Sequence, residues 1–194
     1  MKVITLSREF GAGGHSIGKK VAAELGIELY DKDIIKGVAK KSGIDPEIIF
    51  KEGEEISRKD TFIRSINPIS YDQKDAIFDA EKSIIIELAK KGPCIILGRC
   101  ADVILAEAGI ETIDVFIYAD AAHREKRVSE LLEISNPSDI QREMKRHDHN
   151  RRSYYSYYTD KELGDYKNFD LMLDSGALGN DLCAKLICEA ARNS

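Results

Sequence analysis

The order of apolar and polar positions along the 194 residues predicts short strands that alternate with helices. The runs that have the composition and length of strands are residues 3–6, 28–30, 94–97, 114–118 and 170–173. The segments in which apolar residues recur at helical spacing are residues 16–25, 32–41, 75–91, 121–133, 138–155 and 180–191. This alternation predicts an α/β domain with a parallel sheet covered on both faces. Right-handed crossovers would then place the carboxyl ends of all strands at one edge, where such sheets bind ligands.

Two segments interrupt this alternation. Residues 51–71 are polar and carry Gly53, Asn67 and Pro68, so we interpret them as a mobile insertion. Residues 145–165 are dense in arginine, histidine and tyrosine. We expect both segments to belong to one domain that spans residues 1–194, a length that buries a sizeable core.

Charge and composition argue against several classes of protein. The net charge of -5 argues against broad binding to nucleic acids or anionic membranes. No apolar run approaches the roughly 20 residues that span a bilayer, and the first residues lack a secretory signal, so we expect a cytoplasmic protein. Cys94, Cys100, Cys183 and Cys188 do not have zinc-ligand spacing, which favours reduced thiols in or near the core.

The first strand runs into a glycine-rich stretch with the chemistry of a phosphate site. Gly11, Gly13 and Gly14 precede the helical segment that begins near Ser16. Glycines let the backbone approach a phosphate, and the unpaired amides and dipole of a helix N-terminus attract anions. The Ser16 hydroxyl is of the kind that binds a magnesium ion or a phosphate.

The stretch departs from the phosphate-loop pattern G-x-x-x-x-G-K-[ST]. Arg8 stands where the first glycine would be, and Gly14 stands where the lysine would be. Phosphoryl transfer depends on positioning and charge stabilisation, so another cation must replace the lysine if that chemistry occurs. Arg8 is the nearest candidate, whereas Lys19 and Lys20 are more typical of surface charges. The alternative is a purely structural turn, since glycine-rich turns between strands and helices are common.

Two further strand ends carry candidate ligand-binding groups. Gly98 and Arg99 follow the buried run 94–97, and an arginine there can bind a phosphate bidentately. The alternative for Arg99 is an ion pair with a neighbouring acid such as Asp102. Asp31 follows the run 28–30 and can accept a hydrogen bond from a sugar or base, or cap the next helix, as Asp33 also can.

The segment 145–158 has the composition of an arginine-bearing lid. Arg146, Arg151 and Arg152 lie close to one face of a helix, and Asp148 and Arg152 are an i, i+4 pair. A lid would close its arginines over the phosphates and exclude water. The alternatives are a solvated helix with salt bridges or a basic and aromatic platform for single-stranded nucleic acid, which the acidic net charge disfavours.

Taken together, the motifs SREFGAGGHSIG, LYDKDII, IILGRCADVIL, VFIYA and HDHNRRSYYSYY resemble one family along nearly the whole chain, the cytidylate kinase-like P-loop proteins. The resemblance implies a three-layer P-loop NTPase fold of the nucleoside monophosphate kinase type. This fold has a five-stranded parallel sheet in the order 2-3-1-4-5, with helices on both faces. It also implies a monophosphate-binding insertion over residues 32–74 and a mobile lid over residues 145–165. The implied reaction is phosphoryl transfer from ATP to CMP or dCMP with Mg²⁺.

The resemblance also assigns roles to residues. The residues implied to bind ATP are Gly11, Ala12, Gly13, Gly14, His15 and Ser16, with Ser16 also implied to bind Mg²⁺. The residues implied to bind the acceptor are Asp31, Arg99 and Asp148. The cations implied to act in catalysis are Arg8, Arg99, Arg146, Arg151 and Arg152. The lid arginines would neutralise charge on the transferring phosphoryl group.

Three departures from the family pattern keep other functions open. Gly14 replaces the loop lysine, Cys100 replaces the aspartate of the family's G-R-D segment, and residues 51–71 lack a counterpart of the pyrimidine-recognition region. The leading hypothesis is a kinase of CMP and dCMP, whose partners are small-molecule nucleotides rather than nucleic acids or membranes. The alternatives are a kinase of another small molecule on the same fold and a nucleotide-binding regulatory protein with little catalysis. The oligomeric state does not follow from the sequence.

Overall fold

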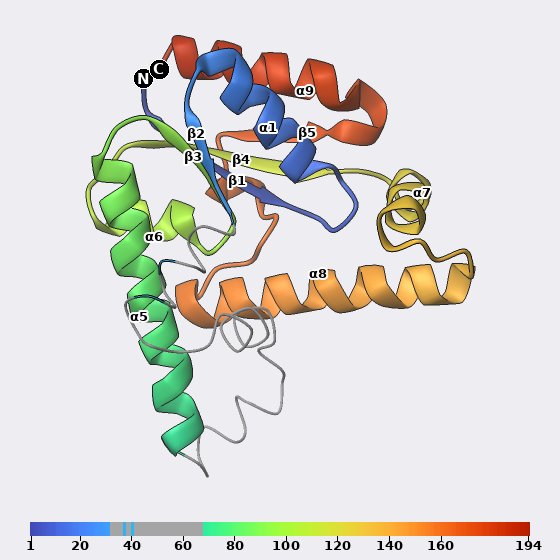
Figure 1. Ribbon diagram of the computed structural model, residues 1–194, viewed down its shortest axis with the longest axis horizontal. Helices are drawn as coiled ribbons and strands as arrows, with labels where there is room; N and C mark the ends of the chain where they lie inside the picture. The colour runs from blue at the N-terminus through green and yellow to red at the C-terminus, as the bar shows by residue number, and fades with distance from the viewer. Residues whose placement is uncertain (32–36, 38–39, 41–67) are drawn as a thin grey trace.

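The structure, a computed structural model, describes residues 1–31, 37, 40 and 68–194, with side chains described from residue 75 in the last range. The strands in this part of the chain form a five-stranded parallel sheet in the order β2-β3-β1-β4-β5 (Figure 1). The strands are β1 (Val3–Arg8), β2 (Glu28–Tyr30), β3 (Cys94–Leu97), β4 (Thr112–Tyr118) and β5 (Leu171–Asp174). The predicted parallel sheet and its strand order are therefore confirmed.

Strand β1 lies at the centre of the sheet and pairs in parallel with β3 and β4. Leu6 is in register with Leu97 on one side and with Val115 on the other. All three side chains are buried, which explains why these strands read as continuous apolar runs. Because every pair is parallel, the residues that follow the strands meet at one edge of the sheet.

Helices cover both faces of the sheet (Figure 1). One face carries α1 (Gly14–Leu25) and α9 (Ser175–Arg192), which pack against each other. The other face carries α5 (Pro68–Lys90) and α6 (Ala101–Glu107), and α8 (Pro137–Thr159) packs its buried tyrosines on that side. The short helix α7 (Ala121–Leu132) lies between β4 and α8 at the ligand-binding edge.

Several helix limits differ from the predictions. The helix predicted over 138–155 continues to Thr159, so most of the segment 145–165 is a regular part of α8. Helix α5 begins at Pro68 and includes the last four residues of the predicted insertion 51–71, whose other residues lie outside the described part of the chain. The helix predicted over 32–41 also lies outside it, except for Gly37 and Lys40.

The last helix contains a break that the sequence pattern anticipates. Gly179 has φ 75° and ψ 158° inside α9, so the regular helix resumes at Asn180, where the prediction placed its start. The preceding turn is capped by Asp174, whose side chain accepts hydrogen bonds from the amides of Gly176 and Ala177. No helix in the described ranges is long and apolar enough to cross a membrane.

Candidate active site

The turn between β1 and α1 has the geometry of a phosphate-binding loop. Gly11 and Gly13 have φ of 83° and 84°, in the left-handed region that favours glycine. A Cβ atom on Gly11 would lie 2.9 Å from the carbonyl oxygen of Arg124, and one on Gly13 would lie 2.8 Å from the Oδ1 of Asn180. The first N–H groups of a helix point out of its N-terminus, here toward the loop. The cap residue Gly13 has no side chain to accept hydrogen bonds from them, so they are available to an anion.

A cavity of about 210 Å³ lies at this loop, and arginines from three different elements converge on it. They are Arg8 at the end of β1, Arg127 in α7 and Arg151 in α8. The other lining residues include Glu9 and also Gly11, Gly13, Gly14, His15 and Ser16, the last five of which the family resemblance assigned to ATP binding. Three guanidinium groups beside a helix N-terminus make a strongly anion-attracting site.

The side chain of Arg8 crosses the site from the loop to the end of β3. A Cβ atom on Gly14 would lie 3.0 Å from both Cβ and Cγ of Arg8 and 3.1 Å from Cδ2 of Leu6. A Cβ atom on Gly98 would lie 2.5 Å from Nη1 of Arg8. Gly14 and Gly98 thus leave the space that the Arg8 side chain occupies. The missing lysine and the presence of Arg8 are therefore parts of one arrangement.

Sequence reasoning missed Arg127. Its Nη2 donates a hydrogen bond to the hydroxyl of Ser16 over 3.2 Å, so its charge lies directly at the first turn of α1. In the sequence Arg127 belongs to the run HREKR, which reads as an ordinary charged helix surface. Nothing in that run distinguishes the residue that faces the loop, because the contact joins positions that are 111 residues apart.

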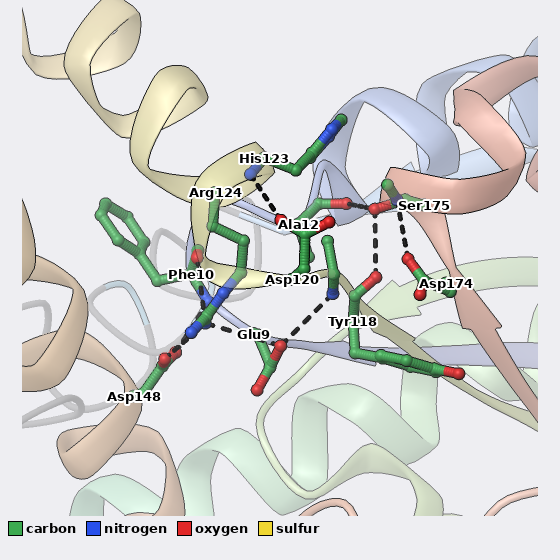
Figure 2. A network of polar contacts seen from close by, with 12 residues as sticks. Glu9, Phe10, Ala12, Tyr118, Asp120, His123, Arg124, Asp148, Asp174 and Ser175 are labelled. Atoms are coloured by element: carbon green, nitrogen blue, oxygen red, sulfur yellow. Dashed lines mark hydrogen bonds and ion pairs between the residues drawn. The ribbon is translucent and has the colours of Figure 1, made fainter.

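Asp148, which the resemblance assigned to the binding of the acceptor, contacts the turn between β1 and α1 (Figure 2). Its Oδ1 accepts a hydrogen bond from the amide of Phe10 at 2.7 Å, and its Oδ2 accepts one from Nη1 of Arg124 at 2.6 Å. Arg124 also lies 3.6 Å from Oε2 of Glu9, and that carboxylate accepts a hydrogen bond from the amide of Ala119. This network attaches α7 and α8 to the loop residues that immediately precede Gly11.

The three arginines assigned to the lid have different surroundings. Arg151 lines the cavity, and its guanidinium carbon lies 5.5 Å from the centroid of the Phe10 ring. Arg146 forms an ion pair of 2.7 Å with Glu143 on the surface of α8. The side chain of Arg152 is 59% exposed. Its Nη2 nevertheless lies 3.8 Å from Oε1 of Glu9, a loop residue that lines the cavity. The structure thus brings Arg151 into the cavity, places Arg152 at its exposed side beside Glu9, and leaves Arg146 paired with Glu143 on the surface of α8.

Asp31 lies at the end of β2, as predicted, and contacts the loop side of the site. Its Oδ2 is 3.2 Å from Nδ1 of His15, a residue assigned to ATP binding. The two residues line one end of a second cavity of about 610 Å³, which extends beside α1 and β2. The residues after Asp31 lie outside the described part, so its alternative role as a helix cap stays a prediction.

Arg99 also lies at the predicted strand end. Its Nη1 donates to Oε1 of Glu81 in α5 over 2.8 Å. Asp102, the neighbouring acid named in the alternative interpretation of Arg99, accepts a hydrogen bond from the hydroxyl of Tyr155 at 2.6 Å. Gly98, Arg99 and Cys100 have φ of 72°, 60° and 53°, an unusual left-handed run in which two residues are not glycine.

Burial controls the ionisation of groups behind the site. It raises the pKa of the Asp102 carboxyl, and proximity to Asp114 raises it further against the opposing hydrogen bond from Tyr155. It also raises the pKa of Tyr154 well above its ordinary value and that of Cys94 to about 11. All four cysteines are buried free thiols, in agreement with the prediction.

The residues present fit a magnesium–nucleotide complex in which the nucleotide supplies most of the ligands. Ser16 offers a hard hydroxyl oxygen at the cavity, a type of ligand that suits Mg²⁺. No group of three histidine, cysteine, aspartate or glutamate residues that could hold a metal occurs within the described ranges. Mg²⁺ keeps several waters and phosphate oxygens around it, so one protein hydroxyl suffices for such a site.

Comparison with known proteins identifies the family. A model of the cytidylate kinase-like family matches residues 3–177. The chain belongs to this family. The match covers the glycine loop, the strand-end arginine and the whole of α8. A search of curated proteins finds no match.

Solved structures agree with this assignment. An uncharacterized protein from Eubacterium ventriosum ATCC 27560 has a TM-score of 0.76 and 25% identity, with 100% of each chain covered. The shikimate kinase from Bacteroides thetaiotaomicron has a TM-score of 0.58 and 12% identity, with 98% of each chain covered. A gluconokinase from Sinorhizobium meliloti 1021 has a TM-score of 0.56 and 15% identity, and the match covers 99% of this chain and 94% of that one. The family and the fold together are those of small-molecule kinases, which use a nucleotide and transfer a phosphoryl group.

Proposed function

We propose that this protein transfers the γ-phosphoryl group of ATP to CMP or dCMP. The observation that carries the proposal is the convergence of Arg8, Arg127 and Arg151 on a glycine loop at a helix N-terminus. Asp31 and Arg99 lie at the neighbouring strand ends, where an acceptor would reach the same edge of the sheet. The preference for cytidine nucleotides rests on the family resemblance.

On the donor side, the chain supplies positive charge and backbone N–H groups to the phosphates. The amides at the start of α1 would bind the terminal phosphates of ATP, and Arg127 and Arg151 would neutralise their charge. Ser16 would hold the Mg²⁺ ion, which would supply charge neutralisation to the phosphates. Because phosphoryl transfer is mostly positioning and electrostatics, these contacts account for a large share of catalysis.

Arg8 would do what a loop lysine does in related proteins. The support for this role is that its side chain passes beside Gly14 of the loop and its guanidinium lies beside Gly98 at the end of β3. An oxygen of the acceptor phosphate would attack the γ-phosphorus while the bond to the β,γ-bridging oxygen breaks and ADP leaves. A cation at this position stabilises the charge that develops on the transferring group.

The test is ADP release with Mg-ATP, measured with CMP, dCMP, UMP and AMP, with shikimate and gluconate as non-nucleotide acceptors. We expect turnover that depends on CMP or dCMP and falls at least about 10³-fold in Arg8→Ala. The matched control is Arg142→Ala, since Arg142 is 67% exposed and pairs with Asp139 on the surface of α8. A rate that no acceptor raises above ATP hydrolysis would contradict the proposal.

A second candidate is a kinase of a different small molecule. The shikimate kinase and the gluconokinase share the fold, and both are named for non-nucleotide acceptors. Cys100 in place of the family's aspartate is the specific departure on the acceptor side that favours this candidate. Turnover with shikimate or gluconate and none with CMP would support it. A regulatory protein, the third possibility, would bind ATP and show no turnover with any acceptor.

A further inference from the structure

A buried carboxylate links the strand-end arginine to the helix that carries Arg151. Glu81 of α5 is 0% exposed. Its Oε1 accepts a hydrogen bond from Nη1 of Arg99 at 2.8 Å, and its Oε2 accepts one from the hydroxyl of Tyr154 in α8 at 2.5 Å. Each oxygen of this carboxylate thus has a different partner, one from the ligand-binding edge and one from α8.

These two bonds fix the position of the Arg99 guanidinium. A fully buried carboxylate is tolerated only where it is paired and hydrogen-bonded, so both partners of Glu81 are required. A guanidinium is a rigid planar fork, and fixing one of its nitrogen atoms restricts the direction of the whole group. Without the Tyr154 hydroxyl, Glu81 would lose the bond that holds its second oxygen, and its position beside Arg99 would no longer be determined.

The backbone at Arg99 shows that the surrounding structure determines its position. Arg99 and Cys100 keep left-handed φ values of 60° and 53°, which cost free energy for residues other than glycine. Such residues persist where packing and hydrogen bonds hold them, and they cluster at functional sites. The preceding residue, Gly98, lies against the guanidinium of Arg8, so a shift of the backbone at Arg99 would also move Arg8 on the donor side.

The same helix reaches the donor loop about 1.7 turns earlier. Asp148 binds the amide of Phe10, and the ring of His147 stacks on the ring of Phe10 at a centroid distance of 4.1 Å. Tyr154 follows Asp148 by six residues, or about 9 Å along a helix. One regular helix therefore contacts both the loop and, through Glu81, the strand-end arginine.

We propose that Glu81 and Tyr154 are positioning residues that hold Arg99 for the anionic group of the acceptor. The role of Arg99 toward the acceptor rests on the proposed kinase function. The positioning of Arg99 by Glu81 and Tyr154 rests on the geometry alone. Helix α8 then sets the distance between the donor and acceptor sides. The pair of motifs that the sequence presents as separate, GRCAD and RRSYY, acts as one unit.

The chain contains a matched control in the adjacent tyrosine. The hydroxyl of Tyr155 donates to the buried carboxylate of Asp102, and Tyr155 lies in the same core as Tyr154. Replacement of either tyrosine by phenylalanine removes one hydroxyl that donates to a buried carboxylate from the same turn of α8. The bond of Tyr154 leads through Glu81 to Arg99, whereas the bond of Tyr155 leads to Asp102.

The experiment compares Tyr154→Phe, Glu81→Gln and Tyr155→Phe with the wild type. The first readout is the Nε–Hε signal of Arg99 in the ¹⁵N NMR spectrum of the free protein, assigned by its absence in Arg99→Lys. The second is the KM for the acceptor, with the ADP dissociation constant measured separately by calorimetry. Thermal unfolding shows that each variant is folded.

We expect Tyr154→Phe and Glu81→Gln to shift or broaden the Arg99 signal and to raise the acceptor KM about tenfold or more. Both should leave the ADP dissociation constant within about twofold, while Tyr155→Phe leaves all three quantities unchanged. An unchanged Arg99 signal in Tyr154→Phe and Glu81→Gln, or an equal change in Tyr155→Phe, would overturn the positioning. A changed signal with an unchanged acceptor KM would overturn the role of Arg99 toward the acceptor. If no acceptor is turned over, the kinase function fails, and the Arg99 signal still decides the positioning.

Discussion

The relation between Arg8 and Gly14 gives the sharpest prediction about the site. In the structure, a Cβ atom on Gly14 would lie 3.0 Å from Cβ and Cγ of Arg8, closer than ordinary van der Waals contact. Restoring the lysine of the phosphate-loop pattern by Gly14→Lys should therefore destabilise the protein instead of improving it. Overpacking of this kind costs about 2 kcal/mol, which lowers the Tm by roughly 4–8 °C in a domain of this size.

The cost should depend on the side chain at position 8. Arg8→Gly removes two of the three atoms that a Cβ at position 14 would approach closely, and Cδ2 of Leu6 remains. The double variant should therefore be at least about 1 kcal/mol more stable than the sum of the two single destabilisations predicts. Gly14→Ala carries the Cβ without the charge and separates the steric effect from the electrostatic one. Denaturant unfolding of the wild type, the single variants and the double variant completes the cycle.

Nucleotide binding should follow the same pattern. Under the proposed function, Arg8→Gly would lose a charge-assisted contact to the phosphates and should raise the ADP dissociation constant about 10- to 150-fold. The double variant should recover at least about tenfold of this loss, because a lysine at position 14 would point its ammonium group at the space left by Arg8. If Gly14→Lys is equally costly with arginine or glycine at position 8, or if Arg8→Gly binds ADP normally, the reasoning is refuted.

Three further predictions concern the surroundings of the site. Asp148→Asn loses its ionic contact to Arg124 beside Phe10 and should cost about 2 kcal/mol, or roughly 4–8 °C in Tm by calorimetry; an unchanged Tm would contradict it. Burial holds the pKa of Asp102 above its ordinary value of 3.8, so the folded state binds that proton more tightly and the Asp102 contribution to stability falls as pH rises. Asp102→Asn should therefore gain stability relative to the wild type between pH 4 and pH 7 in urea titrations, and a constant difference would disprove this. The four cysteines, with the pKa of Cys94 raised to about 11, should resist a thiol reagent in the native state and react fully after unfolding; rapid native reaction would exclude their burial.

The sequence was sufficient for the sheet and for the location of the loop. Strands β1, β3 and β4 are buried on both faces, so they appear in the sequence as continuous apolar runs, a pattern that differs from the alternating apolar and polar positions of a surface helix. Gly11 and Gly13 made the loop predictable from the sequence. Both have a left-handed backbone, and a Cβ atom at either position would lie within 3 Å of a neighbouring atom, so glycine is required there. The limits of α8 were less accurate: the helix was predicted to end at residue 155, but it continues to Thr159, and Tyr157 and Tyr158 of its last turn also pack against the core.

The partners within the site could not be derived from local patterns. The alternative interpretation of Arg99 named Asp102, three residues away, as a possible ion-pair partner, whereas the structure pairs Arg99 with Glu81, 18 residues away in α5. Arg127 was missed because its contact to Ser16 depends on how α7 packs against the loop. In the sequence, Gly14 appears as the replacement of the loop lysine. The structure adds the reason that a larger residue does not fit there, because the Arg8 side chain packs against Gly14.

The most direct test of the kinase function is the transfer of label from γ-³²P-ATP to an acceptor. The wild type, Arg8→Ala and the surface control Arg142→Ala would be incubated with labelled Mg-ATP and CMP, and the products separated by chromatography. The account predicts labelled CDP with the wild type and with Arg142→Ala, and almost none with Arg8→Ala. Label that appears only as inorganic phosphate, or equal CDP formation by Arg8→Ala, would contradict it.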